Sequence, residues 1–184
     1  MASIKGVKLT GIQSHPGLEG NTLFAVVNMD GRTAGFVRDD AYGGPWDIGI
    51  PADVQEEIRR RYREFIAETR KVDEMKLFHM TAEEFVERRD NGTLPVQEDD
   101  NLEFFFSELA DLRDAEKRFK SAVKKGYRAT VEVKFFHING PTPLGYAYQT
   151  GGSPKTYKEI YDEAVAKSPA VLVTQYDSLD DFDL

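Results

Sequence analysis

The sequence predicts an α+β protein with an N-terminal three-stranded antiparallel meander, central helices and a C-terminal β-β-α-β segment. Two short extended runs flank Asp30-Gly31, which indicates a hairpin because both residues tolerate the positive φ of a type I′ turn. Apolar residues recur at helical spacing after Pro51 and again after Asp100. Over residues 127–138, apolar and polar residues alternate as they do in a half-buried strand.

The N-terminal meander is expected to have strands at residues 5–13, 23–28 and 33–38. The first two strands are separated by a short loop that contains His15-Pro16-Gly17 and a further glycine. The second and third strands form the predicted hairpin, and glycines with a proline follow the third strand. Proline cannot donate a ladder hydrogen bond, so the meander is expected to end there.

Three helices are expected in the middle of the chain. Pro51 and Asp53 mark the start of the first helix. Thr81 and Glu84 form a capping-box pattern, which predicts a short second helix. The third helix is longer and ends at residues 124–126, where two lysines in the last turn precede a glycine.

The C-terminal segment is expected to begin with the strand at 127–138 and to return through a second strand at 144–148. Ser153-Pro154 predicts the start of a helix, because serine caps helices and proline suits the first helical position. A last short strand follows at 171–173. The expected organisation is one α+β domain, with a meander at about 1–50, helices at about 51–125 and a β-β-α-β part at about 126–176. An acidic C-terminal tail is expected at 177–184.

Composition excludes several classes of protein. The 184 residues include no cysteine, which excludes disulfides and cysteine nucleophiles and fits a reducing compartment. No run approaches the ~20 apolar residues of a membrane span, so we expect a cytoplasmic protein without a membrane partner. The net charge of −8 argues against a protein that binds nucleic acid by general electrostatic attraction, but leaves room for a local basic patch.

The sequence contains no catalytic signature. The three histidines are far apart and none has metal-ligand spacing. The glycines at residues 151 and 152 precede a predicted helix but lack the spacing of a phosphate-binding loop. We therefore expect no catalytic residue, no metal and no cofactor. An enzyme that holds a cation through Asp39 and Asp40 stays open as a third alternative, although such a site needs further oxygen ligands.

The residues after the hairpin, from Asp39 to Trp46, form an unusual corner in which two carboxylates precede two glycines and a proline. One interpretation is a solvated turn whose aspartates accept hydrogen bonds from nearby backbone amides. The other is a contact surface for a partner. The candidate partner-binding residues of this corner are Asp39, Asp40, Tyr42, Gly43, Gly44 and Trp46.

At these residues the chain resembles an uncharacterised protein family found in bacteriophage and mobile-element genomes. Members of that family have a D-G-K/R turn between two strands and an N/D-D-G-x-G-G corner followed by helices. The matching residues are Asp30, Gly31, Arg32, Asp39, Asp40, Gly43 and Gly44. Ala41 stands where the family usually has glycine, so the pattern does not by itself predict a positive φ there. The resemblance covers roughly the first quarter of the chain and implies no activity.

The last nine residues combine acids with spaced apolar side chains. They resemble the acidic, phenylalanine-containing ends of bacterial and phage single-stranded-DNA-binding proteins, which dock on basic pockets of replication partners. One interpretation is a solvating tail. In the other, Asp180 and Asp181 supply charge to a partner and Phe182 supplies an aromatic anchor.

Two functional hypotheses follow. The first is a non-enzymatic phage or mobile-element protein that binds and modulates a host protein, such as a defence or nucleic-acid-processing enzyme. The alternative is an accessory single-stranded nucleic-acid-binding factor of replication or recombination. Its candidate phosphate contacts are Arg59, Arg60, Arg63, Arg128 and Lys134. The helix arginines alternate with glutamates, so a solvated face with internal ion pairs is the other interpretation of that helix.

Overall fold

The computed structural model describes residues 1–18, 21–77, 83, 87, 101–137, 144–149, 155–167 and 171–184. The structure is an α+β mix, as predicted. The chain divides into two compact units, whereas we expected one domain over residues 1–176. Unit 1 consists of Met1–Phe65, Glu98–Glu116 and Phe182–Leu184, and unit 2 consists of Ile66–Gln97 and Lys117–Asp181.

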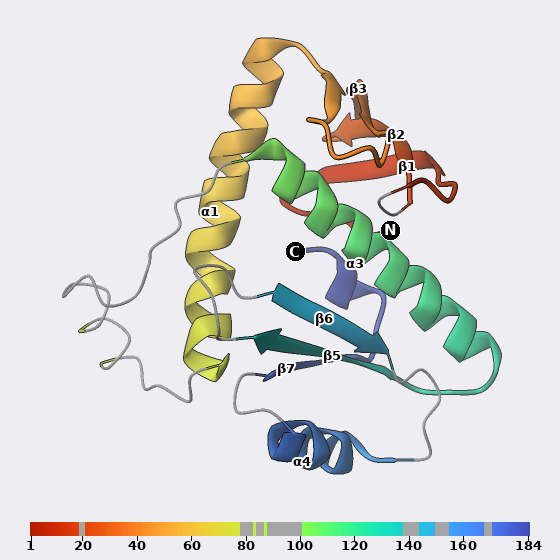
Figure 1. The fold of residues 1–184 in the computed structure, drawn as a ribbon, viewed down its shortest axis with the longest axis vertical. Coiled ribbons are helices and arrows are strands. Elements are labelled where there is room, and N and C mark those ends of the chain that lie inside the picture. Colours follow the sequence, from red (N-terminus) through yellow and green to blue (C-terminus); the bar gives the residue numbers. More distant parts are fainter. Residues whose placement is uncertain are drawn as a thin grey trace. The chain divides into compact units, whose positions relative to one another are not determined.

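Unit 1 contains an antiparallel sheet with the strand order β1-β2-β3-β4 (Figure 1). The strands are β1 (Val7–Gln13), β2 (Leu23–Met29), β3 (Arg32–Asp39) and β4 (Asp47–Gly49). The predicted meander is confirmed, but β4 is a fourth strand that we did not expect. It has only three residues, which is too short for an alternating pattern, and Gly49 pairs with Phe36. A Cβ atom on Gly49 would lie 2.1 Å from the Phe36 ring, so the glycine makes room for this aromatic side chain.

The turn between β2 and β3 has the predicted type I′ backbone, since φ is +50° at Asp30 and +80° at Gly31. A second turn of the same kind occurs at Lys5 and Gly6, where φ is +46° and +78°. The Asp30 N–H donates to the Gly6 carbonyl over 3.1 Å, so the two turns lie side by side. The second turn was not expected, because we assigned residue 5 to the first strand.

Two long helices follow the sheet, and both were predicted: α1 (Ala52–Leu77) and α3 (Leu102–Lys124). Within unit 1 the Tyr62 ring meets the Phe105 ring edge to face, with ring centroids 5.1 Å apart. The Tyr62 hydroxyl also donates to Glu108 over 3.1 Å. The predicted short helix at 81–88 lies outside the described residues, apart from two of its positions, which are helical.

Alternate residues of the sheet strands and one stripe of each helix are buried in unit 1. The buried side chains from the sheet are Val7, Leu9, Ala25, Val27 and Val37, and those from the helices are Ile58, Tyr62, Phe65, Leu102, Phe105, Phe106, Leu109 and Leu112. This alternation on the strands and helical spacing on α1 and α3 are the patterns that the sequence predicts.

Unit 2 contains a second antiparallel sheet with the strand order β6-β5-β7, and α4 (Tyr157–Lys167) lies against it (Figure 1). The strands are β5 (Thr130–His137), β6 (Leu144–Gln149) and β7 (Val171–Tyr176). The packed side chains are Val131, Val133, Ile160 and Ala164, with Val165 and Val173 at their margin. The predicted β-β-α-β order is confirmed. The predicted helix start at Ser153-Pro154 lies outside the described residues, and a Thr156–Glu159 capping box precedes α4.

The first four residues of β5, 130–133, are buried on both faces, so the prediction of a half-buried strand is wrong for this part of the strand. Thr130 and Glu132 lie opposite the α4 side and are also buried. The Tyr176 hydroxyl donates to Glu132 over 3.3 Å, and an Arg118 nitrogen lies 4.0 Å from the same carboxylate. Hydrogen-bonding partners on neighbouring elements offset the cost of burying this carboxylate. The alternation of apolar and polar residues along β5 does not reveal these partners.

The C-terminal residues are ordered, and Phe182 is fully buried. The Ser3 N–H donates to the Phe182 carbonyl over 2.8 Å, and the Leu184 N–H donates to the Ser3 carbonyl over 3.0 Å. Ser3 and Asp183 form a parallel bridge. The expected tail at 177–184 is therefore corrected: its last residues pair with the backbone that precedes β1.

Candidate functional site

The corner that follows β3 is held by hydrogen bonds from its own aspartates. The Ala41 N–H donates to Asp39 Oδ1 over 2.8 Å, and the Tyr42 N–H donates to Asp40 Oδ1 over 3.1 Å. These are the local side-chain to backbone hydrogen bonds that the turn interpretation predicts. Each aspartate uses its Oδ1 atom in this way.

Ala41 and Tyr42 have opposite exposures although they are neighbours. Ala41 has a φ of +55° and only 6% of its surface is exposed. The Tyr42 side chain, in contrast, is 64% exposed. A left-handed backbone at an alanine carries strain of about 1 kcal/mol. The corner therefore keeps a strained residue inside and presents an aromatic ring outside.

The last residue of the corner, Trp46, is hydrogen-bonded to the first turn of α3. The Trp46 N–H donates to Glu103 Oε1 over 3.0 Å, and the Glu103 N–H donates to the Asn101 side chain over 2.9 Å. Gly43 and Gly44 lie between these two anchored ends and are exposed. Because both ends are held, the exposed residues between them have a fixed place on unit 1.

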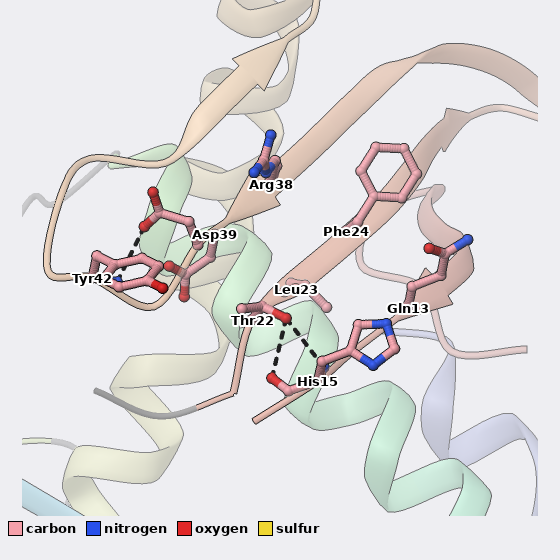
Figure 2. Close-up of a pocket in the computed structure, with 9 residues that line it drawn as sticks. Gln13, His15, Thr22, Leu23, Phe24, Arg38, Asp39 and Tyr42 are labelled. Atoms are coloured by element: carbon pink, nitrogen blue, oxygen red, sulfur yellow. Dashed lines mark hydrogen bonds between the residues drawn. The ribbon is translucent and has the colours of Figure 1, made fainter. Parts of the chain in front are cut away.

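The corner borders a shallow pocket of about 250 Å³. Figure 2 shows Tyr42 and Asp39 on one side of this pocket and Phe24, Gln13 and His15 across from them. The pocket residues are Gln13, His15, Thr22, Leu23, Phe24, Arg38, Asp39, Asp40 and Tyr42. Strand pairing assembles this wall, since Phe24 pairs with Gln13 of β1 and with Arg38 of β3.

A hydrogen-bonded loop closes another side of the pocket. The Thr22 hydroxyl donates to the His15 carbonyl over 3.1 Å and accepts the His15 N–H over 3.1 Å (Figure 2). The Thr22 N–H also donates to the His15 carbonyl over 2.8 Å. Leu18 lies between these two residues in the sequence and is highly exposed. The loop between β1 and β2 therefore presents an exposed apolar side chain, Leu18.

The pocket is lined by aromatic and charged groups. Two exposed rings, Phe24 and Tyr42, stand near a guanidinium group and two carboxylates. Within the described part of the chain, the Arg38 side chain makes no hydrogen bond or ion pair. Among those same residues, no group of three or more His, Asp or Glu side chains could hold a metal ion.

The structure groups some of the predicted site residues and separates others. Asp39, Asp40 and Tyr42 lie together in the pocket wall. The Asp181 carboxylate instead accepts the N–H groups of Asp177 and Ser178, while the Asp180 N–H donates to the Ser178 hydroxyl. The role of Phe182 as an exposed aromatic anchor is corrected by its complete burial.

Sequence reasoning missed six of the nine pocket residues, among them His15, Phe24 and Arg38. Their positions in the chain give no reason to group them. A two-residue turn sets the register of its hairpin, and the pairing of Met29 with Arg32 would by continuation place Phe24 opposite Val37. A β-bulge between Val27 and Asn28 shifts the pairing by one residue and puts Phe24 opposite Arg38 instead. The turn alone was therefore not a usable signal for these residues.

The candidate phosphate contacts on α1 are occupied by glutamates. Arg60 binds Glu57 over 2.7 Å and also Glu64, and Arg63 binds Glu56 over 3.1 Å. Hydrogen bonds from Arg60 and then Arg61 lower the pKa of Glu57 to about 2, so this carboxylate is charged at neutral pH. Arg59 lies 3.9 Å from Glu56. The interpretation of this helix face as internally paired is confirmed.

The two remaining candidate phosphate contacts are in unit 2. Arg128 is exposed and, among the described residues, has no ion pair. The Lys134 side chain lies outside what the structure describes.

Comparison with known proteins returns no match among family models, curated proteins or solved structures. In the portion of the chain that the structure describes, no helix has both the length and the apolar character needed to cross a membrane.

Proposed function

We propose that this chain is a non-enzymatic phage or mobile-element protein that binds and modulates a host protein in the host cytoplasm. A defence enzyme or a nucleic-acid-processing enzyme is the class of partner that we favour. The phage or mobile-element origin rests on the sequence resemblance at the hairpin and corner. The contact surface rests on the corner Asp39–Trp46 and the pocket beside it.

The observation that carries this proposal is the exposure of Tyr42 on a backbone that is held on both sides. Its ring is 64% exposed, its own N–H is bound by Asp40, and the corner ends at the hydrogen bond between Trp46 and Glu103. An exposed aromatic ring on a fixed backbone loses little conformational entropy on binding. Tyrosines in such positions contribute strongly to protein interfaces.

The surroundings of Tyr42 also fit a protein partner. Phe24 adds a second exposed ring, and the charged groups of Arg38, Asp39 and Asp40 lie around the two rings. An apolar centre with a polar rim is the usual composition of a protein-binding surface. The rim charges are of both signs, which supports selection of one partner more than general attraction to a charged surface.

Photo-crosslinking tests the proposal. A photoreactive phenylalanine analogue at position 42 is expected to capture one host protein in a stoichiometric complex. The same analogue at Tyr157, a 40% exposed tyrosine of α4, is the matched control and should capture none. Equal capture from the two positions, or no capture from position 42, would overturn the proposal.

Substitution of Tyr42 provides the quantitative test. With the captured protein purified, Tyr42→Ser should weaken binding by about 30-fold, which corresponds to a hot-spot loss of about 2 kcal/mol. Tyr157→Ser should leave the affinity unchanged. Both variants should keep the wild-type Tm, since both rings are substantially exposed.

A further inference from the structure

We propose that unit 2 carries a contact site for single-stranded nucleic acid at the C-terminal end of α3, formed by Lys124, Lys125, Tyr127 and Arg128. This site is separate from the corner of unit 1 and goes beyond the function proposed for it. Of its four residues, only Arg128 was a candidate phosphate contact on sequence grounds.

Positive charge is concentrated at the C-terminal end of α3. Residues 117–128 contain six basic residues and no acidic residue, whereas the whole chain has 32 acids and 24 bases. Charges of one sign that gather on one segment create a local potential even when the net charge has the opposite sign. The end of α3 is therefore a basic region in an acidic protein.

The charged groups at this end of α3 are accessible to a ligand. Lys124, Lys125 and Arg128 are exposed, and within the described residues they form no ion pair. The arginines of α1 differ, because glutamates one turn away bind them. A phosphate group must displace a bound carboxylate to reach those arginines, but it displaces only water at the end of α3.

The turn at the end of α3 contains an exposed aromatic residue next to the basic residues in the chain. Gly126 has a φ of +87°, and the Tyr127 N–H donates back to the Ala122 carbonyl over 3.1 Å. This Schellman turn reverses the chain within two residues. Tyr127, whose side chain is 43% exposed, consequently lies between Lys125 and Arg128 in a tight turn.

Two acidic residues lie near the site: Asp177 by strand register, and Asp181, whose carboxylate accepts the Asp177 N–H over 2.7 Å. Thr130 pairs with Tyr176, so Asp177 follows at the same end of the β5–β7 pair. The Asp177 carboxylate accepts both of its hydrogen bonds of 2.8 Å from the Gln175 amide, and it makes no ion pair with Arg128. The three cations of the site, Lys124, Lys125 and Arg128, therefore exceed these two carboxylates by one charge.

The combination of cations with an exposed ring favours a single strand over a duplex. Lysine and arginine neutralise phosphates of either form, but a base can stack on tyrosine only when it is unpaired. The site is small, so we expect binding of low affinity with a strong dependence on salt.

Fluorescence anisotropy with labelled oligo(dT) tests this site in the full-length protein. Replacing Lys124, Lys125 and Arg128 with glutamine should reduce the slope of log K against log salt by about 2, at ~0.7 for each phosphate contact. Tyr127→Leu should weaken binding about tenfold. The matched control replaces Arg59, Arg60 and Arg63 with glutamine, which removes the same number of charges and should leave the slope and affinity nearly unchanged.

Several results would overturn the inference. These are the absence of binding at low salt, an equal loss in the two triple variants, or a Tyr127→Leu variant that binds like wild type. Equal affinity for duplex DNA and oligo(dT) would also overturn it. The Tyr42→Ser variant should bind oligo(dT) with the wild-type affinity. A result against partner binding at the corner is therefore distinguishable from a result against oligo(dT) binding at the end of α3.

Discussion

Arg61 of α1 binds Asp30 in the turn of the β2–β3 hairpin through two parallel hydrogen bonds, from Nη1 to Oδ1 over 2.8 Å and from Nη2 to Oδ2 over 2.7 Å. The same guanidinium donates to the Lys5 carbonyl and to Glu57, each over 2.8 Å. The hydrogen bond from Arg61 holds the pKa of Asp30 below its ordinary value. One side chain therefore connects both type I′ turns to the first helix.

Arg61→Lys is expected to lower the free energy of unfolding by about 1–2 kcal/mol, because an ammonium group cannot reproduce the planar fork that meets these acceptors. Arg60→Lys is the matched control on the next residue, and its exposed ion pairs with glutamates predict no measurable change. Urea unfolding monitored by circular dichroism measures both. Equal stability of the two variants would contradict the structural role of Arg61.

Gly6→Ala and Gly31→Ala should differ, although φ is close to +80° at both glycines. A Cβ at Gly31 meets nothing within 4 Å, so that variant should lose only the backbone term of about 1 kcal/mol. A Cβ at Gly6 would lie 2.6 Å from Asp30 Oδ1 and should cost more. Thermal unfolding of both variants checks this order. In an Asp30→Gly background, Gly6→Ala should cost less than it does in the wild type, because the Oδ1 contact is gone.

Ala41→Gly is expected to keep or raise stability by up to about 1 kcal/mol, because glycine adopts the observed φ of +55° without strain. Ala34→Gly within β3 is the control, and it should lose about 0.5–1 kcal/mol because a strand residue with ordinary φ gains only flexibility. Denaturant unfolding of the pair decides the point. A loss at position 41 as large as that at position 34 would argue against a left-handed alanine.

Phe182→Ala should destabilise the protein by about 3–5 kcal/mol, the usual cost of removing a fully buried phenylalanine. Leu179→Ala, three residues earlier, removes a side chain that is 47% exposed and should change stability by less than about 0.5 kcal/mol. A calorimetric Tm for each variant provides the measurement. If Phe182→Ala melted with the wild type, the C-terminal residues would have to be a free tail.

Ionisation of the buried Tyr176 hydroxyl is expected to lower the free energy of unfolding at alkaline pH. Burial, followed by the nearby Glu132 carboxylate, raises the pKa of its hydroxyl above the ordinary value of 10. Because the raised pKa belongs to the folded state, the stabilisation is complete below pH 10 and is lost as the pH rises above it. Tyr176→Phe should flatten this alkaline dependence, measured by urea unfolding between pH 9 and pH 12. An unchanged dependence would show that another group causes it.

The hairpin shows how much of the fold could be predicted from sequence. The turn at Asp30-Gly31 depends on two neighbouring residues that accept positive φ, and the structure confirms both values. The glycine stop at Gly126 is confirmed for the same reason, since a Schellman turn involves only adjacent residues. The turn at Lys5-Gly6 has no aspartate or asparagine to indicate it, and it was missed.

The candidate site was predicted in part. Asp39, Asp40 and Tyr42 were grouped because they are adjacent, and they do border one pocket. His15 and Phe24 join them only through strand pairing and a loop hydrogen bond. The basic residues at 117–128 are visible in the sequence. The sequence does not show which of these side chains are held by carboxylates and which can contact a phosphate.

The sequence by itself determined the features that arise within a few residues: the turns, the helix ends, the alternating strands and the aspartate hydrogen bonds of the corner. Only the tertiary structure decided which distant groups meet. Arg61 finds Asp30, Phe182 is buried, and Glu132 receives the Tyr176 hydroxyl. Backbone conformation depends on local sterics and hydrogen bonds, whereas burial and ion pairing depend on partners that the folded chain brings from elsewhere.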